Sequence, residues 1–319
     1  MRDARVIAVD VGGADIKAGL LEDASAHVGG WIRRPTGQAA GPERVIASIV
    51  ELVAELQARA EREGAPAAAV GLAVPGIVDE EAGVGIYSAT IGWRDVAFQA
   101  LIEERTGLPT AVCHDVRAGG TAEARLGAGR GRGDFLFVPV GAGIGAAVMT
   151  KGHARTGATH RAGEIGHLVV RPDGERCACG AHGCAEAYAS APAIARRYLA
   201  ATGRSAEPAE VARRAAADDM AAGAVWDDAV EALADALLAT VSVLDPSLIV
   251  LGGGLARSGG QLLFPLENAM ISRAGVQAIP PLAPAVLGDR AGCVGAGLAA
   301  MDLAARLRTS RRRVTVFAR

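Results

Sequence analysis

Residues 6–23 read VIAVDVGGADIKAGLLED, an apolar run, a Gly-Gly pair and a second apolar run. This pattern predicts two strands joined by a tight glycine turn. Residues 135–150, FLFVPVGAGIGAAVMT, repeat the pattern. Each hairpin stands near the head of one half of the chain, and further strand and helix patterns follow it. The repetition predicts a duplicated domain, and the alternative is two unrelated hairpins.

Helix and strand patterns alternate along the rest of the chain. Apolar residues recur with helical spacing over residues 45–56, which predicts an amphipathic helix. Strand patterns lie at 67–79, 108–115 and 248–252. Further helices are expected near 95–105, 116–127, 191–200, 208–218, 225–243, 259–273 and 293–307. The alternation predicts an α/β protein with largely parallel sheets.

The bulk properties narrow the class of protein. The chain has 319 residues, enough for two domains, and a net charge of −2, which gives no reason to expect binding to nucleic acid or to a membrane surface. No apolar run approaches the ~20 residues of a membrane span, and the N-terminus lacks a signal-peptide pattern. We therefore expect a cytoplasmic protein. The basic tail, 308–319, is expected to be a solvated or frayed end.

Three of the five cysteines fall within eight residues, in the segment CACGAHGC. Cys177, Cys179 and Cys184, with His167 ten residues before the first, form a set of ligands typical of a closed tetrahedral Zn²⁺ site. Since all four positions are filled by protein, such a zinc would be structural. The alternative is three reduced thiols without metal.

Two carboxylates flank this cluster. Glu164 lies three residues before His167, and Glu186 lies two after Cys184. A loop folded around a metal would bring both toward one place, and carboxylates and imidazoles suit sugar hydroxyls, which both donate and accept. Spacing alone leaves open that they are solvated loop charges.

Three glycine-rich turns indicate contacts with phosphate or nucleotide. Glycine lets a ligand approach the backbone N–H groups closely. The positions concerned are Gly12 and Gly13, Gly141 and Gly143, and Gly253 and Gly254. Lys17, one of only two lysines, could add charge to the first turn. Three such turns in a duplicated layout predict a nucleotide held between two domains.

Two aspartates are candidates for chemistry, of which Asp115 ends a buried-looking strand. Asp115 could take the proton from an attacking hydroxyl, and Asp10, at the first glycine turn, could orient a magnesium ion through water.

The sequence resembles the ROK family of sugar kinases and sugar-responsive repressors. The segment EIGH, from Glu164 to His167, followed by CACGAHGC and Glu186, is similar to that family's zinc signature. DVGGADIK and VGAGIG resemble its two phosphate motifs, and IVLGGGL resembles its adenosine segment. The resemblance runs from about residue 6 to about residue 305.

The resemblance implies the duplicated actin-like, hexokinase-like two-domain α/β fold with an interdomain cleft. We expect a small domain, 1–116 plus 300–319, and a large domain, 117–299, that carries the zinc loop. By resemblance Asp115 is the catalytic base, and Glu164, His167 and Glu186 bind sugar hydroxyls while the zinc fixes their loop. The family also implies ATP, Mg²⁺ and a homodimer.

Four positions depart from the family pattern. His114 and Thr90 stand where the family usually has Asn, and both are expected to line the sugar. Ala14 and Ala142 stand where it usually has Thr at the glycine turns. These two alanines remove hydroxyls near the phosphates. The change either weakens ATP binding or leaves the phosphate contact to backbone N–H groups and Lys17.

The sequence therefore predicts an ATP-dependent kinase that phosphorylates a primary hydroxyl of a hexose or N-acetylhexosamine. Glucose and N-acetylglucosamine rank first, and His114 slightly favours the latter. The alternative is a catalytically weakened ROK-type sugar sensor. A DNA-binding repressor is disfavoured because only five residues precede the first strand, too few for a helix-turn-helix.

Overall fold

The computed structural model describes residues 5–22 and 28–317. The chain forms two compact units, Met1–Ala122 with Arg290–Arg319, and Glu123–Asp289. The sequence placed the boundaries at 116/117 and 299/300. Close packing at two glycines explains the difference at the second boundary, because side-chain carbons there would lie 2.8 Å from the Asp10 carboxylate at Gly292 and 2.0 Å from the Ala118 carbonyl oxygen at Gly295.

The first unit is built on a five-stranded sheet of order β3-β2-β1-β4-β8. Its strands are β1 (Val6–Val11), β2 (Asp15–Leu21), β3 (Val28–Pro35), β4 (Val70–Val74) and β8 (Thr110–His114). β1, β2 and β3 are antiparallel neighbours, while β1, β4 and β8 run parallel. The first glycine hairpin is thus confirmed as β1–β2, and the sequence missed β3.

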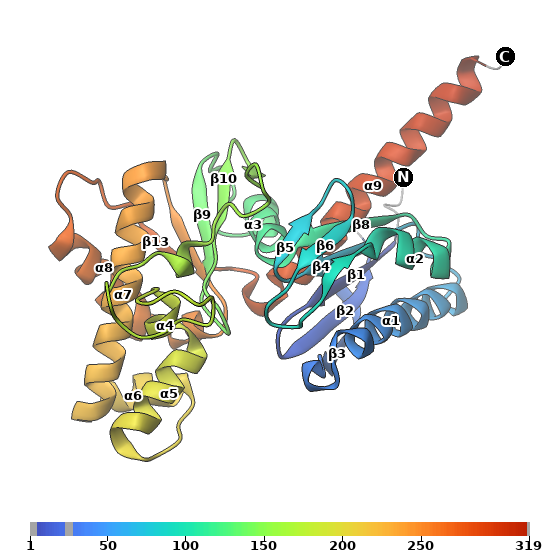
Figure 1. Cartoon of the computed structure of the whole chain (residues 1–319). Coiled ribbons are helices and arrows are strands. Elements are labelled where there is room, and N and C mark those ends of the chain that lie inside the picture. The colour runs from blue at the N-terminus through green and yellow to red at the C-terminus, as the bar shows by residue number, and fades with distance from the viewer. Residues whose placement is uncertain (1–4, 23–27, 318–319) are drawn as a thin grey trace. The chain divides into compact units, whose positions relative to one another are not determined.

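Helices cover both faces of this sheet. The apolar stripe of α1 (Pro42–Arg62), including Val45, Ile49 and Leu52, is fully buried in one core with α2 (Phe98–Thr106). On the other side, α9 (Ala291–Phe317) contributes Ala300 and Ala304 to a cluster with Val6 and Leu21. Figure 1 shows α1 and α2 beside the strands of this unit.

The sequence also missed a small antiparallel sheet of order β5-β6-β7. Its strands are β5 (Ile77–Asp79), β6 (Val84–Tyr87) and β7 (Arg94–Val96). The expected start of a helix at residue 95 was wrong, because Arg94 and Val96 pair with β6 and α2 begins only at Phe98. Strands of three or four residues carry too little periodicity to be recognised.

The second unit repeats the sheet topology of the first, with the order β11-β10-β9-β12-β13. Its strands are β9 (Phe135–Pro139), β10 (Ala147–Thr150), β11 (His153–Ala154), β12 (Ile249–Gly252) and β13 (Leu282–Pro284). Again three antiparallel neighbours are followed by two parallel pairings. Each sheet therefore has one meander and two parallel strands in the same order, which confirms the predicted duplication.

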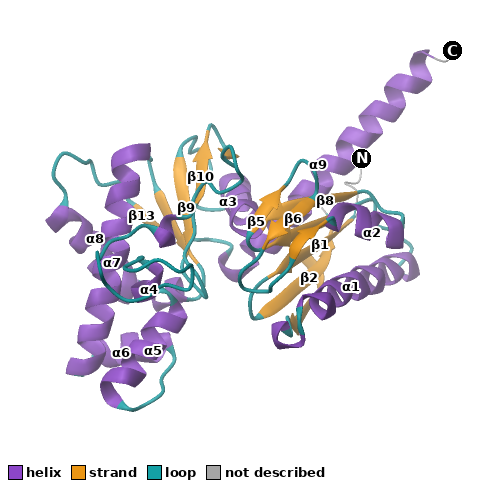
Figure 2. Cartoon of the chain, viewed as in Figure 1, coloured by secondary structure: helices purple, strands orange, loops and turns teal. Residues whose placement is uncertain are grey.

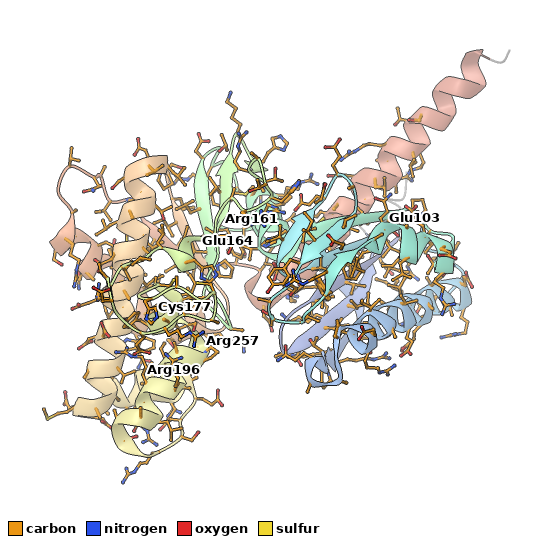
Figure 3. All side chains as sticks on the ribbon, in the orientation of Figure 1. Glu103, Arg161, Glu164, Cys177, Arg196 and Arg257 are labelled. Atoms are coloured by element: carbon orange, nitrogen blue, oxygen red, sulfur yellow. The ribbon has the colours of Figure 1, made fainter. Side chains whose placement is uncertain are left out.

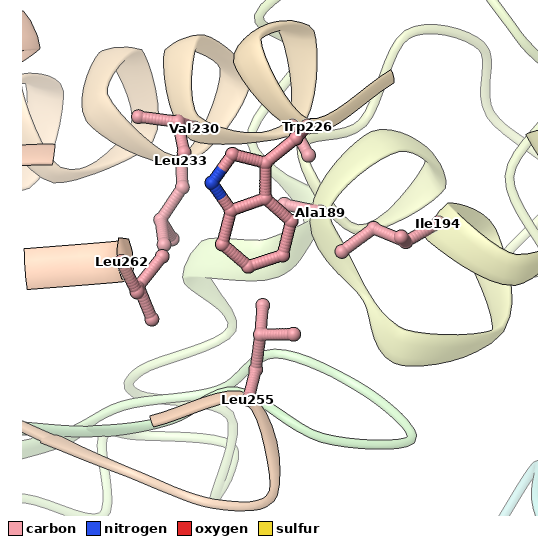
Figure 4. Close-up of a pocket in the computed structure, with 8 residues that line it drawn as sticks. Ala189, Ile194, Trp226, Val230, Leu233, Leu255 and Leu262 are labelled. Atoms are coloured by element: carbon pink, nitrogen blue, oxygen red, sulfur yellow. The ribbon is translucent and has the colours of Figure 1, made fainter. Parts of the chain in front are cut away.

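The helices of the second unit pack around one apolar core. Figure 2 shows these helices in purple. They are α4 (Glu186–Ala189), α5 (Ala191–Thr202), α6 (Pro208–Ala215), α7 (Met220–Leu244) and α8 (Gly260–Arg273). Figure 4 shows an apolar pocket around Trp226, Leu233 and Leu262 in this core. It leaves no space for a water molecule, and Trp226 Nε1 donates to the Gln261 carbonyl at 3.1 Å. This pocket belongs to the packed core.

Two features concern the chain as a whole. Within the described ranges, no helix combines the length and the apolar character needed to cross a lipid bilayer. The backbone of the basic tail continues α9 as far as Phe317, ten residues past the expected end of the helix, and residues 318–319 lie outside the described part.

Candidate functional site

The first phosphate turn, which we define as Gly12, Gly13 and Ala14, joins β1 to β2. The Gly12 N–H donates to the Asp15 carbonyl at 2.9 Å and closes the hairpin. Asp10 and Lys17 are directly paired across the two strands, and Lys17 Nζ lies 3.9 Å from Asp10 Oδ2. Asp10 is 8 % exposed. The hairpin therefore sets a nearly buried carboxylate and an ammonium group next to the turn.

Thr90 lies against this turn. It occupies the loop between β6 and β7, where the buried Ser88 accepts the Ile91 N–H through its hydroxyl at 3.3 Å. A side-chain carbon on Gly13 would come within 3.0 Å of Thr90 Cγ2, so glycine leaves room for this loop. The structure thus brings a residue predicted to contact sugar beside residues predicted to contact phosphate.

Asp115 is the first residue of α3 (Asp115–Leu126), directly after β8, as expected from the sequence. Its side chain is 27 % exposed, and its Oδ1 accepts the Val116 N–H at 2.7 Å. Because a strand end and a helix start fix its backbone, the carboxylate is held at the sheet edge while staying accessible to solvent.

His114 is more enclosed than its neighbour, with a side chain 12 % exposed. Its Nδ1 accepts the Arg117 N–H at 3.4 Å and lies 3.5 Å from Asp115 Oδ1. Burial, followed by the charge of Arg117, lowers the pKa of His114 to about 3. The ring is therefore neutral at physiological pH, and part of its hydrogen-bonding capacity is used within the protein. Its expected contact with sugar stays a prediction.

Two charged residues that the sequence did not single out support this strand end. Arg117, 2 % exposed, donates through Nε to Glu80 Oε1 at 2.8 Å and through a terminal nitrogen to the Val78 carbonyl at 3.1 Å. Glu80 Oε1 also accepts the His114 N–H at 2.9 Å. The ion pair therefore ties the β5 segment to the junction of β8 and α3. No spacing pattern joins residues so far apart in sequence.

The second phosphate turn, residues 141–145, lies next to the predicted adenosine segment. The Val140 N–H donates to the Gly252 carbonyl, and the Leu255 N–H donates to the Val140 carbonyl, both at 3.0 Å. Gly253 has a φ of 78°, and a side-chain carbon there would come within 2.4 Å of the Val140 oxygen. Only glycine fits this conformation and this approach. Gly141, Gly143, Gly253 and Gly254 are thereby brought together.

Glu186, the first residue of α4, is bonded to this turn. Its Oε2 accepts the Ile144 N–H at 2.7 Å, and a side-chain carbon on Gly143 would lie 2.8 Å from the same oxygen. The sequence assigned Glu186 to sugar hydroxyls alone. One of its oxygens is instead engaged with the second phosphate turn, while Oε1 forms no hydrogen bond within the described part of the chain.

Glu164 directly precedes the short helix η2 (Ile165–His167) and His167 ends it, with His167 Nε2 3.8 Å from Glu164 Oε2. Their side chains are 45 % and 33 % exposed. Glycines let this segment lie against the second turn and the residue that follows it, since Gly163 and Gly166 closely approach the backbone oxygens of Ala146 and Ile144 respectively. Figure 3 labels Glu164 and Cys177 on the loops of this unit.

His167, Cys177, Cys179 and Cys184 form a compact group whose candidate ligand atoms all lie within 4.8 Å of one another. Cys177 Sγ is 3.7 Å from His167 Nδ1, and Cys179 Sγ is 3.7 Å from Cys184 Sγ. A tetrahedral Zn²⁺ with Zn–S bonds of about 2.3 Å separates its sulfurs by about 3.8 Å. The geometry fits such an ion, with Nδ1 on the metal side and Nε2 toward Glu164.

Two of the four groups, Cys177 and Cys184, are buried, while Cys179 is exposed. Desolvation raises the pKa of Cys184 to about 12, so without a nearby cation its thiol keeps the proton. A bound Zn²⁺ would stabilise the thiolate form that ligates metal.

The cysteine loop is also fastened by charged contacts that the sequence did not indicate. Glu175 accepts from Arg197 Nε at 2.8 Å, and its backbone N–H donates to the Tyr188 hydroxyl at 2.7 Å. Arg171 donates to Asp235 on α7 at 2.5 Å. These bonds join the loop to α5 and α7 without the help of a metal ion.

The duplicated sheets, each with a glycine turn after its first strand, define a protein of the actin-like, hexokinase-like class. Residues 6–302 match the model of the ROK family. The chain belongs to this family.

Similar proteins agree with this assignment. The glucokinase of Thermotoga maritima is 32 % identical over 286 residues, 85 % of this chain and 88 % of that protein. A ROK hexokinase structure from Thermus thermophilus is 35 % identical with a TM-score of 0.79, covering 93 % of this chain and 97 % of its own. A ROK glucokinase structure from Streptomyces griseus, in complex with glucose and AMPPNP, is 28 % identical with a TM-score of 0.82, covering 94 % and 100 %.

Transcriptional repressors are also similar in sequence to this chain. The DNA-binding transcriptional repressor Mlc of Escherichia coli is 30 % identical over 250 residues, which cover 75 % of this chain and 59 % of the repressor.

Proposed function

We propose that this chain transfers the γ-phosphoryl group of ATP to a primary hydroxyl of a hexose, with glucose as the first candidate. An ATP-dependent sugar kinase is the enzyme class that the glucokinase relatives support, and one of the similar structures contains both glucose and an ATP analogue. The observation that carries the proposal is that each unit places candidate phosphate and sugar groups side by side, Gly13 beside Thr90 and Ile144 beside Glu186.

Asp115 is assigned as the general base. It accepts the proton of the sugar hydroxyl as that oxygen bonds to the γ-phosphorus, and the bond from phosphorus to the oxygen of the departing ADP breaks. Its accessible carboxylate at the start of α3 suits this role. Mg²⁺ would neutralise phosphate charge, and Asp10, next to the first phosphate turn, is the residue we assign to hold it through water.

The sugar ligands are assigned to the loops already described. Glu164, His167 and Glu186 are proposed to bind sugar hydroxyls, and the same role is proposed for Thr90. His114 is retained as a residue that affects the choice of sugar, and N-acetylglucosamine stays the second candidate. Glucose ranks above it because the relatives similar over most of the chain are glucokinases.

We assign a structural Zn²⁺ to His167, Cys177, Cys179 and Cys184. The separations of 3.7 Å support this assignment because they match those of a tetrahedral site. The ion would fix the loop that carries Glu164 and His167, so that these side chains are held in place before sugar arrives. A homodimer, expected from the family, is tested by light scattering of the purified chain.

A coupled assay of ADP release over a panel of hexoses and N-acetylhexosamines tests the proposal. We expect turnover with glucose that depends on Mg²⁺ and falls strongly in Asp115→Asn. The repressor relatives favour a second candidate, a sugar sensor with weak or no catalysis. Sugar binding by calorimetry without ADP release from any sugar would support the sensor and refute the kinase.

A further inference from the structure

All three carbonyl groups of the first phosphate turn are bonded to one short segment, Thr36 to Gln38. The Thr36 hydroxyl donates to the Gly12 oxygen at 2.7 Å, and the Thr36 N–H donates to the Ala14 oxygen at 2.8 Å. With the Gln38 amide assigned so that its nitrogen faces the neighbouring oxygens, Nε2 donates to the Gly13 oxygen at 2.9 Å. Thr36 is 2 % exposed, so its bonds are shielded from water.

These bonds decide where the N–H groups of the turn point. In a trans peptide the C=O of one residue and the N–H of the next point in opposite directions. Because the oxygens of Gly12 and Gly13 face Thr36 and Gln38, the N–H groups of Gly13 and Ala14 face away from them. Neither N–H donates to an acceptor within the described residues. Two successive N–H groups on one side of a turn are a favourable environment for an anion.

Gln38 also reaches the neighbouring loop. Its Nε2 donates to the Thr90 carbonyl at 3.2 Å as well as to Gly13. One amide therefore links the first phosphate turn to the loop between β6 and β7. Since Thr90 Cγ2 packs closely over Gly13, that loop lies on the turn and limits its movement.

We propose that Thr36 and Gln38 are positioning residues that orient the Gly13 and Ala14 N–H groups toward a phosphate of the bound nucleotide. This inference rests on the proposed kinase function. Ala14 carries no hydroxyl to donate to phosphate, so the first turn must bind through its backbone. The orientation of the backbone then decides its affinity, and the brace formed by Thr36 and Gln38 fixes that orientation in advance.

The first test replaces Thr36. Thr36→Val keeps the branched shape and the backbone N–H but removes the hydroxyl donor, while Thr36→Ser keeps the donor. The probe is Mg²⁺–AMPPNP, titrated by calorimetry into the full chain without sugar. We expect Thr36→Val to bind it about threefold to tenfold more weakly than wild type, as the loss of one hydrogen bond implies. Thr36→Ser should recover most of the affinity.

The second test replaces the Gln38 amide with an acceptor of the same shape. Gln38→Glu cannot donate to the Gly13 oxygen and should weaken Mg²⁺–AMPPNP binding by at least as much as Thr36→Val. Gln57→Glu is the matched control, because Gln57 Nε2 also donates to a backbone carbonyl, that of Thr106 at 3.2 Å. Gln57 lies on α1, away from the turn, so the control should bind the nucleotide like wild type.

The outcomes separate this inference from the proposed function. Wild-type affinity for Mg²⁺–AMPPNP in both Thr36→Val and Gln38→Glu would overturn the positioning role, whatever sugar is phosphorylated. Equal loss in Thr36→Val and Thr36→Ser would also overturn it, since the hydroxyl would then be irrelevant. A wild-type chain that binds Mg²⁺–AMPPNP but phosphorylates no sugar would refute the kinase and leave the brace intact.

Discussion

Glu186 Oε2 accepts the backbone N–H of Ile144 at 2.7 Å. The bond joins the first residue of α4 to the second phosphate turn. If Glu186 also binds a sugar hydroxyl through Oε1, as we propose, one carboxylate serves both ligands of the kinase. The two functions can then be separated by substitutions that keep or remove the acceptor for Ile144.

Substitution of Glu186 should divide its two roles. Glu186→Gln keeps an oxygen for the Ile144 N–H but loses the charge, so we expect weaker glucose binding with nearly unchanged Mg²⁺–AMPPNP binding. Glu186→Ala removes both the acceptor oxygen and the charge, so the affinity for Mg²⁺–AMPPNP should also fall, by about threefold to tenfold. Calorimetric titrations with glucose and with Mg²⁺–AMPPNP measure the two affinities. Glu267→Gln on α8 is the control. Identical nucleotide affinities in Glu186→Ala and wild type would show that the bond to Ile144 does not shape the turn.

Asp115→Asn tests the general base. The amide keeps the shape and can still accept the Val116 N–H, but it cannot take a proton from the sugar. A general base typically contributes ~10²–10⁴-fold in rate, so kcat should fall by that order while glucose affinity stays close to wild type. Steady-state kinetics and calorimetry check the two halves of this prediction. A kcat within a few-fold of wild type would place the base elsewhere.

Removal of one cysteine ligand should release the metal. Cys179→Ser, or treatment with a chelator, should lower the zinc content below the expected one ion per chain, reduce Tm and weaken glucose binding together. Metal analysis and calorimetry provide the measurements. Cys293→Ser is the control, because that thiol bonds to the Ala8 carbonyl outside the cluster and zinc should be retained. Full zinc content in Cys179→Ser would contradict the assigned ligand set.

His114 should contribute to the pH dependence of stability. Its pKa is lowered from 6.5 to about 3, so the unfolded chain takes up the proton first as pH falls. The contribution of the neutral ring to the free energy of unfolding is complete above pH 6.5. It is lost as pH falls toward 3, at ~1.4 kcal/mol per pH unit. Wild type should therefore lose more Tm than His114→Asn between about pH 7.5 and about pH 5.

Calorimetric melting at the two pH values measures that difference, with the exposed His153→Asn as the control. Equal losses of Tm in wild type and His114→Asn would mean that the ring is not held neutral. The same variant tests the choice of sugar. A change in the ratio of kcat/KM between glucose and N-acetylglucosamine would place His114 in sugar selection, whereas equal losses would indicate support of Asp115.

The sequence alone determined much of the frame of this protein. Apolar runs around Gly12–Gly13 and Gly141–Gly143 were long enough to predict both hairpins and the duplication, because strand periodicity and glycine turns are local signals. The ligand cluster was equally local, since His167 and the three cysteines lie within eighteen residues. Asp115 was placed correctly, directly after a strand.

Only the tertiary structure decided which of these residues touch. Arg117 contacts Glu80, Gln38 contacts Gly13 and Thr90, and Glu186 contacts Ile144. The residues of each pair are at least 25 positions apart in the sequence. No local pattern encodes such pairs, because a polar side chain acquires its partner from the packing of sheets and helices around it. The sequence therefore named the chemical groups, while the fold determined that Glu186 is bonded to residues 141–145 and that Thr36 and Gln38 are bonded to the carbonyl groups of Gly12–Ala14.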